Sequence, residues 1–119
     1  MMEGRPSLAA LASFGPRLDS AYLLGGLEAS GVVEEVLGIV YRSGWVDLTF
    51  DWTAWSEGRA LFLDDHSRIA SATSDELRKL ITAIARMDRF SEGYLGERME
   101  DGTVQAIVNR AKVLLAGGQ

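Results

Sequence analysis

The stretch TSDELRKLITAIARM, residues 73–87, constrains the fold more than any other part of the chain. Thr73 and Glu76 have the spacing of a capping box, in which two side chains satisfy backbone N–H groups at the start of a helix. Apolar residues then recur at intervals of three and four, which places on one helix face Leu77, Leu80, Ile81, Ile84 and Met87. The pattern predicts a long amphipathic helix whose apolar stripe must be covered by other elements.

Other segments carry the same helical spacing of apolar residues. Residues 31–44 and 104–115 show it most clearly, and glycines follow the apolar run in both, as at many helix ends. Shorter helices are predicted over residues 7–14, 18–25 and 94–99. These segments cover most of the chain, so they predict a helical protein.

The stretch WVDLTFDW, residues 45–52, interrupts the helical pattern because apolar and polar residues alternate in it, as in a strand. No second segment could pair with it, and a lone strand makes no sheet in a monomer. We therefore predict an extended connector over residues 45–51, with strand pairing between two chains as the alternative. Asp51 is placed to cap a helix over residues 52–63. Residues 64–68, DDHSR, are then expected to form a loop with His66 exposed.

The predicted fold is all-α: a compact single-domain bundle of about five or six helices, with one extended connector around residues 45–51. We expect residues 1–6 to be a flexible N-terminus and residues 7–119 to form a single helical domain. The length of 119 residues suits one domain with one core. A content of 47% hydrophobic and 24% charged residues is ordinary for a globular protein.

Charge and residue usage exclude several function classes. The net charge of −5 and the pI of about 4.8 oppose non-specific binding to nucleic acid or to an anionic membrane. The absence of cysteine excludes disulfides, thiol catalysis and thiolate metal sites, and one histidine cannot make a multi-histidine site. We predict no metal and no cofactor. No apolar run reaches the roughly 18 residues of a membrane span and no signal peptide is evident, so a cytoplasmic location is expected.

The densest group of charged residues lies in RMDRFSEGYLGERMEDG, residues 86–102. One interpretation is structural: Arg86 and Arg89 end one helix, Glu92 begins the next, and ion pairs between them stabilise the corner. The other is an anion site, because two guanidinium groups can bind a carboxylate with paired hydrogen bonds. No P-loop, GxSxG, HExxH or dinucleotide motif occurs, so catalysis is uncertain and a non-enzymatic role is favoured.

All three tryptophans lie between residues 45 and 55. They either pack in the core or form a stacking wall for a ring or a protein side chain. A pocket is predicted if residues 50–58 and 80–110 meet in space. Its candidate ligand-binding residues are Asp51, Trp52, Trp55, Arg86, Asp88, Arg89, Phe90 and Glu92.

These same two regions resemble a family of small bacterial and archaeal proteins of unknown function, the DUF6508 type. The resemblance rests on F-D-W-x-x-W at residues 50–55, on R-x-x-R-F-x-E-G at residues 86–93, and on the acidic-glycine turn at residues 101–102. It covers roughly the C-terminal two thirds of the chain and implies no mechanism and no catalytic residues. Ser91 stands where the resemblance implies a small residue that is often cysteine, so a thiol role is not carried over.

Two functions follow as hypotheses. The first is a non-catalytic binding or regulatory module that acts through a protein partner or as a homodimer, and it predicts an exposed apolar patch on the order of several hundred Å², whereas a smooth polar surface would count against it. The second is a small-molecule-binding protein or small enzyme with a pocket walled by Trp52 and Trp55 and charged by arginine and carboxylate groups. The second hypothesis requires Trp55 and Arg89 to lie on the same side of the molecule.

Overall fold

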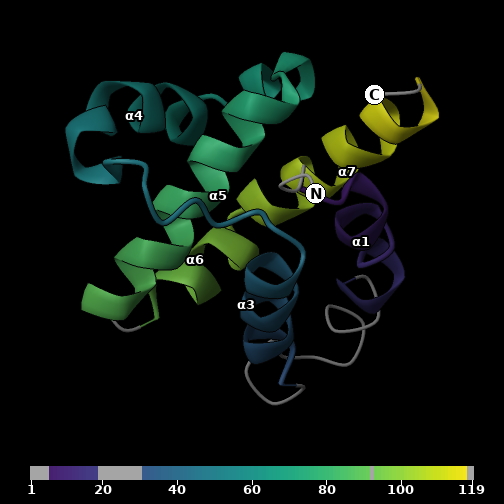
Figure 1. The fold of residues 1–119 in the computed structure, drawn as a ribbon, viewed down its shortest axis with the longest axis horizontal. Helices are drawn as coiled ribbons and strands as arrows, with labels where there is room; N and C mark the ends of the chain where they lie inside the picture. Colours follow the sequence, from purple (N-terminus) through teal and green to yellow (C-terminus); the bar gives the residue numbers. More distant parts are fainter. Residues whose placement is uncertain (1–5, 19–30, 92, 118–119) are drawn as a thin grey trace.

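The computed structural model describes residues 6–18, 31–91 and 93–117, and within these ranges it contains helices and no strand (Figure 1). The all-α prediction is therefore confirmed. The elements with complete bounds are α1 (Leu8–Ala12), α3 (Val32–Arg42), the 3-10 helix η1 (Trp52–Trp55), α4 (Ser56–Asp64), the 3-10 helix η2 (His66–Ser71), α5 (Ser74–Phe90), α6 (Tyr94–Glu100) and α7 (Thr103–Ala116). Residues 15–18 are also helical, while the rest of the helix predicted over residues 18–25 lies outside the described residues.

Helix α5 runs through the middle of the molecule, and its start is the predicted capping box (Figure 1). The backbone N–H of Thr73 donates to Glu76 Oε1 at 2.9 Å, and the N–H of Glu76 donates to Thr73 Oγ1 at 3.1 Å. Leu77 and Ile84 of the predicted stripe are buried, while Met87 near the end of the helix is only half-buried. The stripe thus anchors the core around the first three turns of α5.

The first and last helices of the described chain lie side by side (Figure 1). Leu8 and Leu11 of α1 are buried, as are the apolar residues that α7 presents to the core, Val104, Ile107, Val108, Ala111 and Leu114. The stripe predicted for residues 104–115 is confirmed except at Leu115, whose side chain is exposed. With a radius of gyration of 13.4 Å, the chain has the size of a compact domain.

The segment after α3 is the predicted connector, without helix or strand from residue 45 to residue 51. Its first residue, Trp45, is fully buried, and the indole Nε1 donates to the carbonyl of Ser7 at 2.8 Å. The backbone N–H of Asp47 donates to the hydroxyl of buried Thr82 at 2.9 Å. The Thr82 hydroxyl in turn lies 2.7 Å from the carbonyl of Arg78. The connector is therefore fixed to α1 and α5 by its own polar groups.

Two details of the sequence prediction are wrong. Residues 52–63 do not form one helix, because the 3-10 helix η1 precedes α4, and the residues after Asp65 form η2 rather than a loop. Asp51 stands at the N-cap of η1, the 3-10 helix, and its carboxylate accepts from the hydroxyl of Thr53 at 2.7 Å. Asp65 starts η2 in a related way, accepting from both the N–H and the hydroxyl of Ser67.

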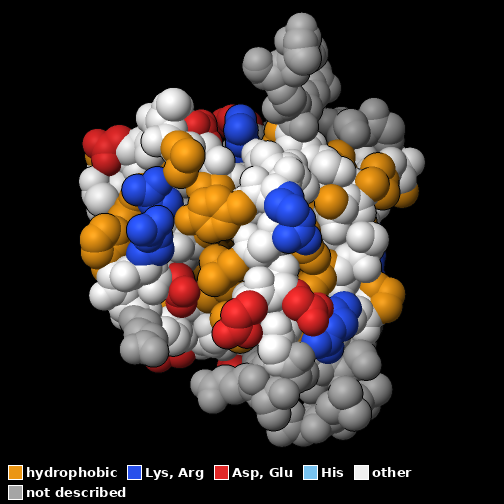
Figure 2. All heavy atoms as spheres, turned by 60° about the horizontal axis from the view of Figure 1, so that its bottom comes forward, with side chains coloured by type: hydrophobic (Ala, Val, Ile, Leu, Met, Phe, Trp, Pro, Cys, Tyr) orange, Lys and Arg blue, Asp and Glu red, His pale blue; other side chains and the backbone are white. Residues whose placement is uncertain are grey.

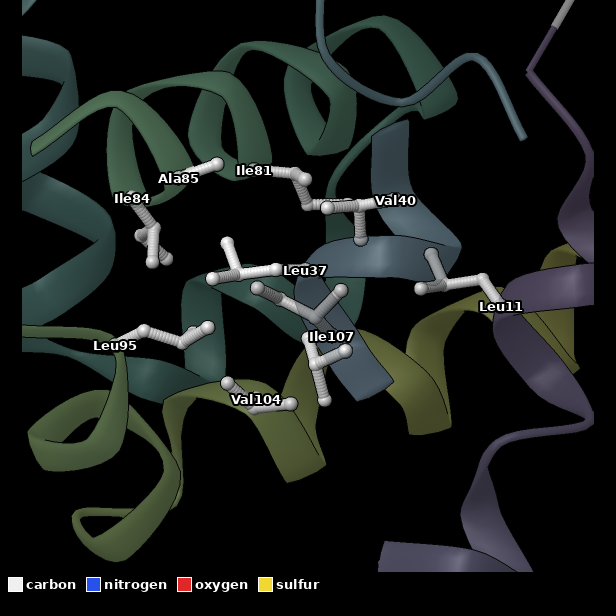
Figure 3. A pocket seen from close by; sticks show the side chains of 10 residues that line it. Leu11, Leu37, Val40, Ile81, Ile84, Ala85, Leu95, Val104 and Ile107 are labelled. Carbon is white, nitrogen blue, oxygen red and sulfur yellow. The ribbon is translucent and has the colours of Figure 1, made fainter. Parts of the chain in front are cut away.

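A small apolar cavity of about 30 Å³ lies between the core helices (Figure 3). Side chains from α5 and from α7 point toward Leu37 of α3 across it. Its lining comes from five helices: Leu11, Val36, Leu37, Val40, Ile81, Ile84, Ala85, Leu95, Val104 and Ile107. The space is close to that of a single water and offers no polar partner, so it is a packing defect and not a ligand site.

Candidate functional site

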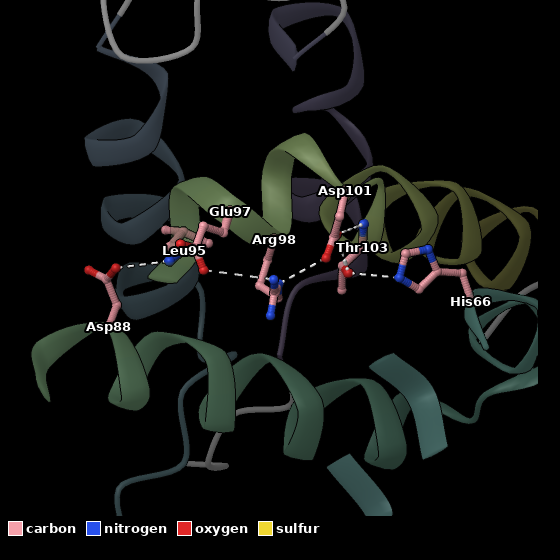
Figure 4. A network of polar contacts seen from close by, with 7 residues as sticks. All are labelled: His66, Asp88, Leu95, Glu97, Arg98, Asp101 and Thr103. Carbon is pink, nitrogen blue, oxygen red and sulfur yellow. Dashed lines mark hydrogen bonds and ion pairs between the residues drawn. The ribbon is translucent and has the colours of Figure 1, made fainter. Parts of the chain in front are cut away.

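The charged stretch over residues 86–102 forms a helix corner with a network of hydrogen bonds and ion pairs (Figure 4). Asp88 of α5 accepts a hydrogen bond from the backbone N–H of Leu95 at 2.9 Å, which satisfies a free donor at the start of α6. Gly93, before α6, has a φ of 89°, a left-handed conformation that favours glycine. Glu92 lies outside the described residues, so the predicted pairs with Arg86 and Arg89 are not tested. Asp88 thus has a structural role at this corner.

The network continues from α6 into α7 and η2 (Figure 4). Arg98 Nε lies 3.0 Å from Asp101 Oδ2, and the hydroxyl of buried Thr103 donates to Asp101 Oδ1 at 2.6 Å. Because that hydroxyl proton is used, Thr103 Oγ1 accepts from His66 Nε2 at 2.9 Å. His66 is therefore half-buried and bonded, and the prediction of an exposed loop histidine is wrong.

The two segments required for the predicted pocket meet at one pair of aromatic rings. The centroids of Trp52 in η1 and Phe90 at the end of α5 lie 6.1 Å apart with the rings tilted by 30°. The Arg59 Cζ atom lies 6.0 Å from the Trp52 ring centroid, within the range of a cation–π contact. Arg86 precedes Phe90 by one turn of α5. We call Trp52, Arg59, Arg86 and Phe90 the aromatic–arginine face.

Two guanidinium nitrogens of this face are buried without a hydrogen-bond partner among the described residues, namely Nη1 of Arg59 and Nε of Arg86. Buried donors are nearly always paired in native proteins, with protein or with water. At the same time, the Phe90 side chain is 75% exposed although its neighbour Trp52 is half-buried. The face therefore presents an apolar ring to solvent beside two arginines that each have one buried guanidinium nitrogen without an acceptor among the described residues.

The Trp55 ring lies apart from the contact between Trp52 and Phe90. Its ring packs against Phe50, at a centroid distance of 5.8 Å, and against Phe62, at 6.1 Å. Beside it lies an open hollow of about 380 Å³, which we call the Trp55 hollow, lined by Trp55, Gly58, Leu61, Phe62, Arg68, Ser71, Glu76 and Lys79. Trp52 is not among these residues, so the two tryptophans of the predicted pocket serve two separate places. Asp51 and Arg89 are exposed and line neither the hollow nor the contact of Trp52 with Phe90.

Comparison with known proteins places this arrangement in a family. A model described as a family of unknown function, DUF6508, matches residues 8–117. The chain belongs to the DUF6508 family. No match was found among curated proteins or among solved structures. The DUF6508 match extends the resemblance seen in the sequence toward the N-terminus, so it includes α1 and α3 as well as both aromatic regions.

Several residues of this DUF6508 protein that could bind a ligand were not found by sequence reasoning. Arg68, Glu76 and Lys79 reach the Trp55 hollow from η2 and α5, far from the motifs that drew notice. Gly58, three residues after Trp55 in the sequence, could have indicated that the Trp55 ring lies against a helix backbone. A Cβ atom at Gly58 would lie 2.4 Å from the indole Nε1, so glycine lets the ring approach the backbone of α4.

The carboxylate that precedes η1 is held in its charged form. A hydrogen bond from the Thr53 hydroxyl lowers the pKa of Asp51 from its ordinary value. Asp47, in the connector, has its pKa lowered in the same way by Thr49. Within the described residues, no three histidine or carboxylate side chains gather as they would around a metal ion, and no helix there is long and apolar enough to cross a bilayer.

Proposed function

We propose that this DUF6508 protein is a non-catalytic binding module that acts through protein–protein contacts, and that its partner docks on the aromatic–arginine face. The observation that carries the proposal is the exposure of Phe90, 75% open to solvent beside Trp52. Covering a side chain of this size is worth about 1.5–3 kcal/mol. Tryptophan and arginine are also the residues most enriched among those that dominate binding energy at interfaces.

The chemistry of the face favours a partner that presents an apolar side chain next to a carboxylate. The apolar group would cover Phe90, and the carboxylate would pair with the guanidinium groups of Arg59 and Arg86. The chain as a whole has a net charge of −5, so an acidic partner is repelled by most of the surface. A local group of arginines would therefore orient such a partner toward this face.

The side of the molecule drawn in Figure 2 suits contact at a few limited sites better than contact over one large apolar area. On the side drawn in Figure 2, hydrophobic side chains lie in small groups between basic and acidic ones. Interfaces that form and dissociate have this mixed composition and are about as apolar as the rest of a protein surface. Affinity in such an interface comes from a few anchoring side chains.

The test is affinity capture with matched variants. Immobilised wild type, Phe90→Ser and Val113→Ser are exposed to extract of the source organism, and retained proteins are quantified by mass spectrometry. Val113 is 59% exposed on α7 and serves as the control. We expect a partner retained by the wild type and by V113S and lost with F90S, and with purified partner an affinity loss of about 30-fold.

Retention that is equal for F90S and wild type would contradict the proposal. Light scattering over a range of concentrations distinguishes the kind of partner. If the wild type dimerises and F90S stays monomeric, the partner is a second copy of this chain. Higher salt should weaken the complex, because salt screens the attraction between the arginines and a carboxylate of the partner.

A further inference from the structure

The Trp55 hollow shares no residue with the aromatic–arginine face. We propose that it is a second binding site, for a small aromatic monocarboxylate whose ring lies against Trp55 and whose carboxylate is held by Arg68 and Lys79. The site does not depend on the proposed protein–protein contact. It would give this binding module a small-molecule ligand as well.

The size of the hollow suits such a ligand. Its volume of about 380 Å³ falls in the range of roughly 300–1,000 Å³ that is usual for small-molecule sites. The core cavity, at about 30 Å³, is too small for any organic ligand. The hollow is also open at the surface, between α4, η2 and the start of α5, so a ligand can enter without movement of the core.

The Trp55 ring, which forms the apolar wall of the hollow, is fixed by the residues that pack against it. Phe50 contacts the Trp55 ring edge-on, with an interplanar angle of 68°, and Phe62 lies against it at 36°. Any side chain at Gly58 would collide with the indole, because the Trp55 ring lies directly against the backbone of α4. A flat aromatic group can stack on a wall fixed in this way with little loss of side-chain freedom.

The charges around the wall favour a single negative charge on the ligand. Arg68 and Lys79 contribute two positive charges, and Glu76 contributes one negative charge. Glu76 Oε1 already accepts from the backbone N–H of Thr73, so its place is set by the capping box. Asp65 and Asp75 also lie beside these two cations, so a bound carboxylate takes their place, and Glu76 would repel a dianion more than a monocarboxylate.

The two cations are available to a ligand. Arg68 Nε lies 3.9 Å from Asp65 Oδ2, at the limit of an ion pair, and Lys79 Nζ lies 3.4 Å from Asp75 Oδ2. Both pairs involve exposed side chains, and exposed pairs of this kind contribute little to stability. A carboxylate bound over the hollow could replace them as the partner of Arg68 and Lys79.

The test compares two probes that differ in charge, 2-naphthoate and the neutral 2-naphthamide, by NMR of the indole N–H groups. The resonances are assigned by replacing each tryptophan with phenylalanine. We expect 2-naphthoate to shift the Trp55 resonance in a saturable way at millimolar concentration, and the amide to bind about tenfold more weakly. An unshifted Trp55 resonance, or equal affinity for both probes, would overturn the proposal.

Variants locate the site. Lys79→Met removes the charge and keeps the length of the side chain, so it should weaken 2-naphthoate about tenfold and leave the amide unchanged. Lys112→Met, at an exposed lysine of α7, is the matched control and should change neither. Gly58→Ala should weaken both probes, because it displaces the Trp55 ring. An unaltered affinity of K79M for 2-naphthoate would overturn the assignment. Phe90→Ser should leave both probes unaffected, which separates this site from the partner face.

Discussion

Trp45 and the pair Trp52 and Trp55 look alike in the sequence, yet they lie in opposite environments. Trp45 is fully buried and its indole N–H has a partner in Ser7, while Trp52 and Trp55 are half-buried and border the two candidate sites. The turn at residues 48–50 separates the two regions. A run of tryptophans therefore divides between core and surface according to the path of the backbone.

The two regions are held by different kinds of hydrogen bond. Around Trp45 the bonds join residues far apart in the chain: the Arg78 Nε donates to the carbonyl of Gly44 at 3.0 Å, and Thr82 accepts from the N–H of Asp47. Around Trp52 the bond is local, from Thr53 to Asp51. We therefore expect the region around Trp45 to contribute more to stability than the region around Trp52, which the proposed partner would contact.

The largest difference in stability between the two regions is expected when the indole rings of Trp45 and Trp52 are removed. Trp45→Ala should lower the free energy of unfolding by roughly 3–5 kcal/mol, because it leaves a cavity and a carbonyl without its donor. Trp52→Ala should cost roughly 1 kcal/mol. Urea unfolding measures both, and Trp45→Phe offers a milder variant if W45A does not fold. Similar losses at the two positions would contradict the distinction.

A smaller effect is expected from Thr82→Val, which keeps the shape of a fully buried side chain and removes its hydroxyl. The N–H of Asp47 then has no acceptor, and a loss of about 1–3 kcal/mol should follow. Thr53→Val is the matched change in the outer region and should stay within about 0.5 kcal/mol. A neutral T82V would show that water replaces the hydroxyl.

The helix corner gives a third and smaller contrast. Asp88→Ala removes the acceptor of the Leu95 N–H at the start of α6, and a loss of about 1 kcal/mol is expected, as for other side chains that satisfy helix starts. Glu100→Ala, at an exposed position on α6, is the control. Equal stability of the two variants in urea would mean that Asp88 does not stabilise the corner.

The smallest difference between the two regions should appear in how the free energy of unfolding depends on pH. Asp47 and Asp51 each accept a hydrogen bond from a threonine hydroxyl, so both regions should respond alike. Both pKa values are lowered in the folded chain, so the unfolded chain binds more protons in acid. Their contribution to stability is present above about pH 4, the ordinary value of aspartate, and is lost as pH falls below it. Unfolding titrations of Thr49→Val and Thr53→Val should each show a shallower decline in acid than wild type.

The helices that bury one apolar face against the core could be predicted from the sequence. Helix α5 is the example, with its capping box and its regular spacing of apolar residues. The 3-10 helices could not. Asp51 and Asp65 are each followed two residues later by a hydroxyl that bonds their carboxylate. Such local bonds compete with the start of an α-helix, and the outcome depends on contacts that the sequence does not display.

The candidate sites were predictable only in part. The resemblance indicated that residues 50–58 and 86–93 matter, and the contact of Trp52 with Phe90 brings them together. The separation of Trp55 from Trp52 could not be foreseen, because it depends on the 3-10 geometry of η1. The position of Lys79 beside the hollow could not be predicted for another reason. It depends on which face of α5 is turned toward α4.

The contact between α1 and α7 has a consequence for the chain during its synthesis. Leu8 and Leu11 leave the ribosome before α7, and this helix that covers them is made almost a hundred residues later. Until α7 emerges, the growing chain carries apolar side chains without their cover. Nascent forms of this protein should therefore be clients of chaperones that bind short apolar segments, and the mature fold should form only after translation reaches α7.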